Sequence, residues 1–402
     1  MSCKLNDVCE LIVDCPHSTE PDEGEGYPII RTPNIGVGYL DLEGVQRVSK
    51  AAYDRRNIRA VPRPNDLILA REAPAGNVGI IREGMKVCLG QRTVLIRPSA
   101  EKVSPLFLNY YLNAPKQRHA LLSNSNGATV SHVNMPVIRN LVIELPDREA
   151  QDRIADVLSA YDELIENNRR QIKLLEEAAQ RLYKEWFIDL KFSGHETTPI
   201  VDSLPEGWKR GTLLTLVDVV RGCSYSSDEI IQGEKTLINL GNLTPFGGFR
   251  FGYEKPFSGK SREDQMVAKG DVVMGLTEQA IGLAGYAALL PTVPDGSVIS
   301  ADLVKIAPKQ GVPAEFVYAL LRYGRLSELI SPLANGTKIK HLRPQSLSRA
   351  TTQIPSIELM QRYAAVVCPA YEQIDVCQQQ VAAAREVRDR LLPKLMSGEI
   401  EV

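Results

Sequence analysis

The sequence predicts an α+β fold: two tandem β-rich domains separated by a long antiparallel helical coiled-coil pair, in a pseudo-two-fold arrangement. Three observations lead to this prediction. The chain of 402 residues is longer than one hydrophobic core usually serves. Its sequence repeats once along the chain, and each copy of the repeat ends in a segment whose apolar residues have the heptad spacing of a coiled coil.

The repeat is clearest in two short polar segments, "GATVSHVNM" at 127–135 and "GTKIKHLRP" at 336–344, which lie 209 positions apart. The same shift aligns residues 139–158 with residues 348–367. An internal period this long indicates a duplicated domain with a connector, because solenoid repeats are far shorter.

Each polar segment contains one histidine, His132 in the first and His341 in the second. A recurring histidine could mark a catalytic pair, a metal site, or one structural turn used twice. If the two domains stand at opposite ends of a helix, these residues cannot share a ligand. We therefore interpret them as equivalent positions in two loops that lead into the last strand of each domain.

The repeated domains are expected to consist mainly of strands, because short β-rich runs are separated by Gly, Pro and Asn. In the first copy these runs are 27–35, 65–73, 76–81 and 91–98, followed by a helical run at 104–115. In the second copy they are 236–243, 270–278, 284–291 and 300–308, followed by a helical run at 313–324.

The two connectors are expected to be long helices that pair along one seam, since their apolar residues keep the same heptad register. The seam residues are Leu158, Ile165, Ile172, Leu175, Leu182, Val367, Ile374, Val381 and Leu391. The first helix would be on the order of 60 Å long. Pro369 is expected to break the second helix early and restart it, because proline lacks the backbone N–H.

These elements define the expected domain boundaries. The first β-rich domain spans 1–146, the first spacer helix 147–190, a linker 191–210, the second β-rich domain 211–355, and the second spacer helix with the C-terminal tail 356–402.

The charge distribution separates the helices from the domains. Residues 147–190 carry a net charge of −4 and residues 358–402 a net charge of −2, whereas the whole chain has a net charge of −2. The remainder is therefore basic. The seven cysteines show no CxxC spacing, so buried free thiols are expected rather than a zinc site or disulfides. No apolar run has transmembrane length, and we expect a cytoplasmic protein with no membrane partner.

The sequence shows no catalytic signature. It has no GxGxxG opening a βαβ unit, no GxSxG, no HExxH and no Asn-Pro-Pro-aromatic tetrapeptide. The segment "EKPFSGKS" at 254–261 ends like a phosphate-binding loop, but Glu254 stands where the first glycine is required. We therefore expect a binding protein with no catalytic residues and no metal.

Several longer motifs resemble one known family. A duplicated domain precedes the helical segments at 144–187 and 356–402, "LPEGWKRG" at 204–211 opens the second copy, and the chain ends in "LLPKLMSGEIEV". Together with "GQRTVLIRP" at 90–98, this pattern resembles the specificity (S) subunits of type I restriction-modification systems. The resemblance covers essentially the whole chain.

The resemblance implies a DNA-binding role without catalysis. In that family each target-recognition domain reads one half of a bipartite target in double-stranded DNA, and the helix pair sets the spacing. Two methyltransferase (modification) subunits that bind S-adenosylmethionine dock on the helices and methylate adenine at N6. Restriction/translocase subunits that use ATP and magnesium join them. This chain would bind no cofactor itself, and it would take part in defence against foreign DNA.

Candidate DNA-binding residues are polar side chains near the repeated motifs, since Arg pairs well with guanine and Asn or Gln with adenine, while Lys more often contacts phosphate. In the first domain they are Arg31, Asn34, Arg71, Gln91, Arg92, Thr129, Ser131 and His132. In the second domain they are Asn239, Asn242, Arg250, Lys260, Arg262, Thr277, Lys338, Lys340 and His341. Arg92 and Lys340 are preferred because they flank motif positions.

Two alternatives compete with this interpretation. One is a coiled-coil scaffold or adaptor without sequence-specific DNA binding. The other is a self-sufficient nuclease or methylase, which the missing catalytic signatures make the weaker of the two.

Overall fold

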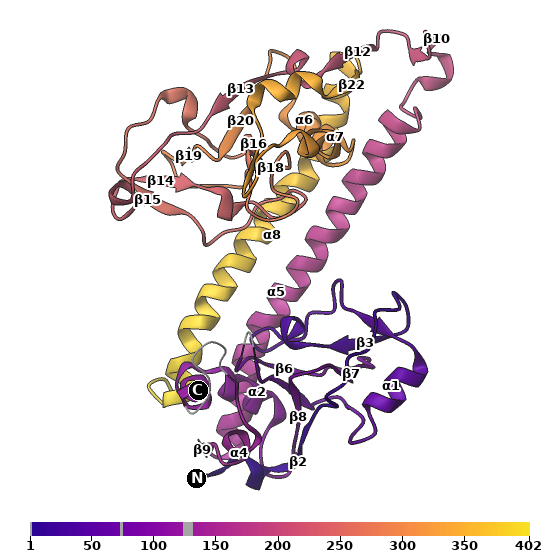
Figure 1. Ribbon diagram of the computed structural model, residues 1–402. Coiled ribbons are helices and arrows are strands. Elements are labelled where there is room, and N and C mark those ends of the chain that lie inside the picture. The colour runs from indigo at the N-terminus through magenta and orange to yellow at the C-terminus, as the bar shows by residue number, and fades with distance from the viewer. Residues whose placement is uncertain (1, 73–74, 124–131) are drawn as a thin grey trace. The chain divides into compact units, whose positions relative to one another are not determined.

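The computed structural model describes residues 2–72, 75–123 and 132–402 (Figure 1). The chain forms two compact units. The first unit consists of Met1–Glu163 together with Ala384–Val402, and the second of Leu164–Ala383. Each unit has its own hydrophobic cores, and each is described by itself.

The first unit is built around a four-stranded antiparallel sheet in the order β2-β8-β5-β6. The strand β5 reads Leu-Ile-Leu-Ala and all four residues are buried, which explains why its sequence is a continuous apolar run. The four strands are β2 (Cys9–Asp14), β5 (Leu67–Ala70), β6 (Val78–Ile80) and β8 (Thr93–Pro98).

In the described part of the first unit, smaller sheets and several short helices accompany this sheet (Figure 1). In the three-stranded sheet β3 pairs with β7 in parallel. Its strands are β3 (Tyr27–Ile30), β4 (Arg47–Val48) and β7 (Cys88–Leu89), and the remaining pair is β1 (Ser2–Lys4) with β9 (Val142–Glu144). The helices are α1 (Lys50–Arg56), α2 (Pro105–Asn113), α3 (Pro115–Ser123) and α4 (Met135–Arg139).

The second unit contains the same kinds of sheet. Its four-stranded sheet has the order β13-β20-β16-β18, its three-stranded sheet has the order β15-β14-β19, and β12 pairs with β22. The strands are β12 (Lys209–Thr212), β13 (Val217–Arg221), β14 (Lys235–Ile238), β15 (Lys255–Phe257), β16 (Val272–Gly275), β18 (Ala287–Leu289), β19 (Val298–Ile299), β20 (Leu303–Pro308) and β22 (Thr351–Ile354).

The remaining elements of the second unit are short. The helices α6 and α7 follow β20, a hairpin of β10 and β11 lies in the expected linker, and β17 pairs with β21. Their bounds are α6 (Ala314–Arg322), α7 (Leu326–Ile330), β10 (Ile200–Val201), β11 (Leu204–Pro205), β17 (Thr277–Glu278) and β21 (Lys340–His341).

The sheets of the two units follow one plan. Each four-stranded sheet is antiparallel, and each three-stranded sheet contains one parallel pair, β3–β7 in the first unit and β14–β19 in the second. In each unit a strand from the start of the domain pairs with one from its end, β1 with β9 and β12 with β22. This shared topology is what a duplicated domain predicts.

Two long helices contribute to both units. They are α5 (Arg148–Tyr183), which continues into the π-helix Lys184–Ile188, and α8 (Ile357–Ser397). The expected seam residues are buried or half-buried in their own units. In the second unit Gln171 of α5 contacts Cys377 of α8, and Ala179 contacts Tyr363. Because residue numbers rise along one helix and fall along the other, the two helix segments run antiparallel in this unit.

The prediction that Pro369 breaks the second helix is wrong, because α8 is continuous from Ile357 to Ser397. A proline inside a helix costs about 3 kcal/mol, since it removes one hydrogen bond and its ring crowds the preceding turn. Pro369 is exposed, but Val367 and Tyr371 beside it are buried in the core of the second unit. Burying each large side chain contributes about 1.5–3 kcal/mol, so packing along the helix outweighs the cost of the proline.

All seven cysteines are free thiols. Burial raises the pKa of Cys9 and of Cys88 to about 12, because the charged thiolate is disfavoured away from water. Both thiols therefore stay protonated at neutral pH. None of the helices in the described part of the chain is long and apolar enough to cross a membrane.

Candidate functional site

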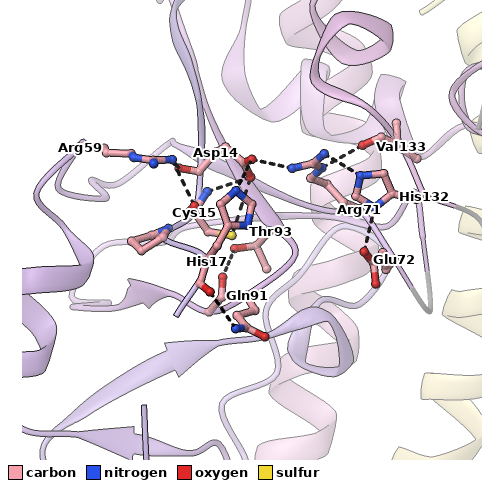
Figure 2. Close-up of polar contacts among 12 residues, drawn as sticks. Asp14, Cys15, His17, Arg59, Arg71, Glu72, Gln91, Thr93, His132 and Val133 are labelled. Atoms are coloured by element: carbon pink, nitrogen blue, oxygen red, sulfur yellow. Dashed lines mark hydrogen bonds and ion pairs between the residues drawn. The ribbon is translucent and has the colours of Figure 1, made fainter. Parts of the chain in front are cut away.

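A network of charged side chains surrounds His132 in the first unit (Figure 2). Arg71 lies at its centre: Nη1 is 2.6 Å from Asp14 Oδ2, and Nη2 is 2.7 Å from His132 Nε2. On the other side of the imidazole ring, Nδ1 is 2.8 Å from Glu72 Oε1. Glu72 also accepts from Arg92 Nε at 2.7 Å. We call Asp14, Arg71, Glu72, Arg92 and His132 the His132 network.

The ends of neighbouring strands bring these residues together. Asp14 is the last residue of β2, Arg71 and Glu72 follow β5, and Arg92 precedes β8. Since β2, β8 and β5 are adjacent in one sheet, these chain positions meet at one edge of it. Backbone hydrogen bonds fix the arrangement, because Arg71 N–H donates to Arg92 O at 2.8 Å and Val133 N–H donates to Arg71 O at 3.0 Å.

The contacts of His132 define its tautomer. Arg71 has only donors, so Nε2 of His132 must accept the hydrogen bond from Nη2. The ring proton is then on Nδ1, which donates to the Glu72 carboxylate. With both nitrogens engaged, His132 has neither the free lone pair nor the free proton that catalysis or metal binding requires.

Arg71 and Arg92 have different environments although both bind a carboxylate. The Arg71 side chain is 8% exposed and its Nε also donates to Val133 O at 2.8 Å. The Arg92 side chain is 61% exposed. Arg92 is therefore available to a partner molecule, whereas Arg71 holds the network in place.

We expect Arg71→Ala to lower the free energy of unfolding of the first unit by about 3 kcal/mol, because it removes the buried guanidinium that pairs with the Asp14 carboxylate. Arg92→Ala should change it by less than about 1 kcal/mol, since exposed ion pairs contribute little. Hydrogen exchange of first-unit amides in both variants measures the difference. Equal losses would contradict the assignment of different roles to the two arginines.

A buried arginine positions the loop that follows β2. Arg56 is 2% exposed; its Nη1 donates to Ser18 O at 2.8 Å and its Nη2 to Pro16 O at 3.0 Å. In the same loop His17 O accepts from Gln91 Nε2 at 3.2 Å. The predicted residue Gln91 therefore lies beside the network and is tied to the backbone of this loop.

The second unit has an equivalent site around His341. Leu276 N–H donates to Asp302 O at 2.7 Å, and Leu342 N–H donates to Leu276 O at 2.7 Å. These two hydrogen bonds correspond to those from Arg71 N–H to Arg92 O and from Val133 N–H to Arg71 O in the first unit. Leu276 therefore occupies the position of Arg71, and Asp302 that of Arg92. His341 precedes Leu342 as His132 precedes Val133, so the two histidines are equivalent. Likewise Arg221 occupies the position of Asp14, because it pairs with Val304 as Asp14 pairs with Val94.

His341 has the same tautomer as His132 for a different reason. Thr277 Oγ1 donates its one proton to Asp302 Oδ1 at 2.6 Å, so it must accept from His341 Nδ1 at 3.2 Å. Among the described residues no arginine forms a hydrogen bond with the other ring nitrogen, since Leu276 stands at the position of Arg71.

The two sites thus have the same backbone arrangement but differ in the charges of their side chains. The equivalent pairs are Asp14 and Arg221, Arg71 and Leu276, Glu72 and Thr277, Arg92 and Asp302, and His132 and His341. Among these five pairs, histidine is the one residue type that both sites keep. In each site it contacts the second residue after the equivalent strand, Glu72 after β5 and Thr277 after β16. A short helix, α4 in the first unit and the 3-10 helix Pro344–Arg349 in the second, lies between each histidine and the final strand.

Four other predicted residues form two equivalent turns rather than part of the histidine sites. The backbone N–H of Arg31 donates to Asn34 Oδ1 at 3.1 Å, and that of Asn239 donates to Asn242 Oδ1 at 3.1 Å. Arg31 is exposed, whereas Asn242 is 0% exposed. Asn242 therefore holds a loop and cannot reach a ligand in this conformation.

The remaining predicted residues differ in their exposure and in their contacts. Arg250 lies over the Tyr253 ring at 4.2 Å and Arg262 pairs with Asp264 at 2.9 Å. The three lysines predicted to bind DNA are exposed, namely Lys260, Lys338 and Lys340. Thr277 is 3% exposed and serves the network around His341. Thr129 and Ser131 lie outside the described residues.

Sequence reasoning missed four charged members of the two sites, namely Asp14, Glu72, Arg221 and Asp302. Asp14 and Arg221 each end the second strand of their domain, but the β-rich runs identified in the sequence begin only after these residues. In the described part of the chain, no group of three or more His, Cys, Asp or Glu side chains is placed to hold a metal ion.

Comparisons with known proteins agree with this architecture. Residues 1–177 match the family model for the type I restriction modification DNA specificity domain. The chain is 26% identical to the MjaIX specificity subunit of Methanocaldococcus jannaschii, over 99% of this chain and 93% of that protein. It is 23% identical to the MjaVIII specificity subunit of the same organism, over 95% of this chain and 88% of that protein.

A solved structure shows the same fold. The S subunit of a type I restriction-modification system from M. genitalium matches with a TM-score of 0.60 at 14% identity, covering 98% of this chain and 95% of that chain. The repeated sheets and the long helices therefore have the same fold as that S subunit. In sequence and in fold the chain is therefore similar to specificity subunits of type I restriction-modification systems. The alternative of a coiled-coil scaffold without sequence-specific DNA binding is not favoured.

Proposed function

We propose that this chain is the DNA-recognition subunit of a type I restriction-modification complex and that each β-rich domain reads one half of an asymmetric bipartite target. The observation that carries the proposal is the change of charge between equivalent positions of the two units, above all Asp14 against Arg221. Side-chain donors and acceptors at base edges decide which sequence a protein prefers. Two copies of one scaffold with different charges at one edge can therefore read different half-sites.

We further propose that α5 and α8 form an antiparallel coiled coil that sets the spacing between the half-sites in a pseudo-two-fold arrangement. The burial of seam residues such as Leu158 and Val367 within their own units supports it. The antiparallel contacts of the two helices in the second unit point the same way. Two methyltransferase subunits would dock on these helices.

The chemistry belongs, in this proposal, to the partner subunits. Methyltransferase subunits carrying S-adenosylmethionine would modify adenine at N6, and restriction/translocase subunits would use ATP and magnesium. This chain would recognise the DNA sequence and bind no cofactor. In support, both ring nitrogens of His132 are engaged by neighbouring side chains, and the sequence carries none of the catalytic motifs sought above.

Exchange of one domain tests the proposal. Residues 1–146 are replaced by the first domain of another specificity subunit, and the chain is co-produced with its methyltransferase subunit. Genome-wide methylation profiling should then show a change in one half of the bipartite motif, because each domain reads its half independently. The matched exchange of residues 211–355 should change the other half. A change in both halves after a single exchange, or no bipartite motif with the parent chain, would refute the proposal.

A further inference from the structure

The site around His341 contains a hollow. It has a volume of about 400 Å³, and its charged or polar lining includes Arg221, Thr277, His341, Arg343 and Gln345. None of the described residues that line it is acidic. The hollow is therefore positively charged and rich in hydrogen-bond donors.

The hollow follows from one difference between the repeats. In the first unit the Arg71 guanidinium occupies the space between Asp14 and His132 and binds both. In the second unit Leu276 stands at the position of Arg71 and lines the hollow instead. The shorter, uncharged side chain of Leu276 thus takes the place of the Arg71 side chain, and the space that the guanidinium fills in the first unit stays open.

The two arginines of the hollow are available to a ligand. Arg221 is exposed, and its guanidinium has one hydrogen bond, from Nε to Ala301 O at 3.3 Å. Arg343 is exposed as well. Neither guanidinium forms an ion pair with any residue in the described ranges. Arg71 and Arg92, by contrast, are both paired with carboxylates.

His341 adds an acceptor to these donors. Its Nδ1 proton is directed to Thr277, so Nε2 of the neutral ring carries a lone pair. In the first unit the matching nitrogen of His132 is taken by Arg71. Two free guanidinium groups beside a hollow are suited to a ligand that presents several acceptors close together, and the ring acceptor is suited to a donor next to them.

We infer that the hollow at Arg221, His341 and Arg343 binds a pair of hydrogen-bond acceptors on DNA, and that the described residues of the first domain form no such site. The inference rests on the proposed function. The acceptors come either from N7 and O6 of a guanine, which Arg contacts with two parallel bonds, or from the oxygens of a backbone phosphate. The first domain cannot offer this site because Asp14 stands in place of Arg221 and neutralises Arg71.

The test uses the full chain in complex with its methyltransferase subunit, with Arg221→Ala, Arg343→Ala and Arg221→Lys as variants. Arg210→Ala is the matched control, since Arg210 is also an exposed arginine of the second unit but lies on β12, away from the hollow. Methylation profiling of the parent complex gives the motif. A duplex with that motif is then the probe in binding measurements at several salt concentrations.

Both alanine variants should bind the parental duplex on the order of 10- to 100-fold more weakly than the control does. If the acceptors belong to a guanine, the second half of the motif loses its preference at one position, and Arg221→Lys does not restore it, because lysine lacks the paired donors. If they belong to a phosphate, the motif is unchanged, the salt dependence becomes shallower, and Arg221→Lys restores much of the affinity.

Two results distinguish a failure of the inferred DNA site from a failure of the proposed function. If the parent complex methylates a bipartite motif but the alanine variants bind and methylate like the Arg210→Ala control, the hollow is not a DNA site and the inference is overturned. If the parent complex shows no bipartite motif at all, the proposed function itself fails. Thermal unfolding of each variant confirms that the exposed arginines were removed without loss of the fold.

Discussion

Phe316→Ala is expected to lower the free energy of unfolding of the second unit by about 4 kcal/mol, because it empties the centre of an aromatic cluster. Phe316 lies on α6 and is 0% exposed. Its ring centroid is 5.1 Å from that of Phe187 and 6.4 Å from that of Tyr363. These neighbours come from the π-helix after α5 and from α8, so one side chain joins three helical elements of this unit.

Tryptophan fluorescence during urea unfolding measures the loss, since both tryptophans of the chain contact this cluster. The centroid of Trp186 is 6.3 Å and that of Trp208 is 6.1 Å from the Phe187 ring. Leu329→Ala is the control, because Leu329 is 59% exposed and should change stability by less than about 0.5 kcal/mol. A loss below about 1 kcal/mol for Phe316→Ala would show that the cluster does not hold the helices of this unit together.

Much of the fold follows from local sequence patterns. Apolar runs bounded by Gly, Pro or Asn became strands such as β5 and β16, and the predicted seam positions became buried or half-buried residues of α5 and α8. The one clear failure, at Pro369, has a physical reason. Local rules count the lost hydrogen bond of a proline, but they do not include the burial of Val367 and Tyr371 on either side of it.

The site was harder to predict than the fold, because no single shift of the sequence on itself aligns every part of the two repeats. A shift of 209 residues pairs His132 with His341 correctly, but it pairs Arg71 with Ala280 instead of Leu276. Loops of unequal length between strands change the offset, and only strand pairing restores it. The exchange of Asp14 for Arg221 was therefore hidden in the sequence.

Burial also separated candidates that looked alike in sequence. Asn242 and Thr277 were chosen for their hydrogen-bonding groups, yet both are buried, and their polar atoms bind neighbouring backbone and side chains. Residue type indicates what a side chain can bind. Only the packing around it shows whether a ligand can reach it.

Asp162→Ala is expected to lower the free energy of unfolding of the first unit by about 3 kcal/mol, because it removes the buried partner of the Arg388 guanidinium and leaves only the exposed Asp389 carboxylate beside it. Arg388 Nη1 of α8 lies 2.6 Å from Asp162 Oδ1 of α5, and both side chains are about 15% exposed. Tyr110 of α2 donates to the other oxygen of Asp162. Burial disfavours the charged form of Arg388, but its hydrogen bonds to Asp162 and Asp389 outweigh that effect and raise its pKa.

A double-mutant cycle separates the ion pair from the packing around it. The variant with both Asp162→Ala and Arg388→Met should recover part of the stability lost in Asp162→Ala, because it leaves no buried charge without a partner. Hydrogen exchange of β5 and α2 amides reports on the first unit alone. If the double variant is as unstable as the sum of the single variants, Asp162 and Arg388 act independently, and the contact between α5 and α8 in this unit depends on the apolar seam around Leu158 instead.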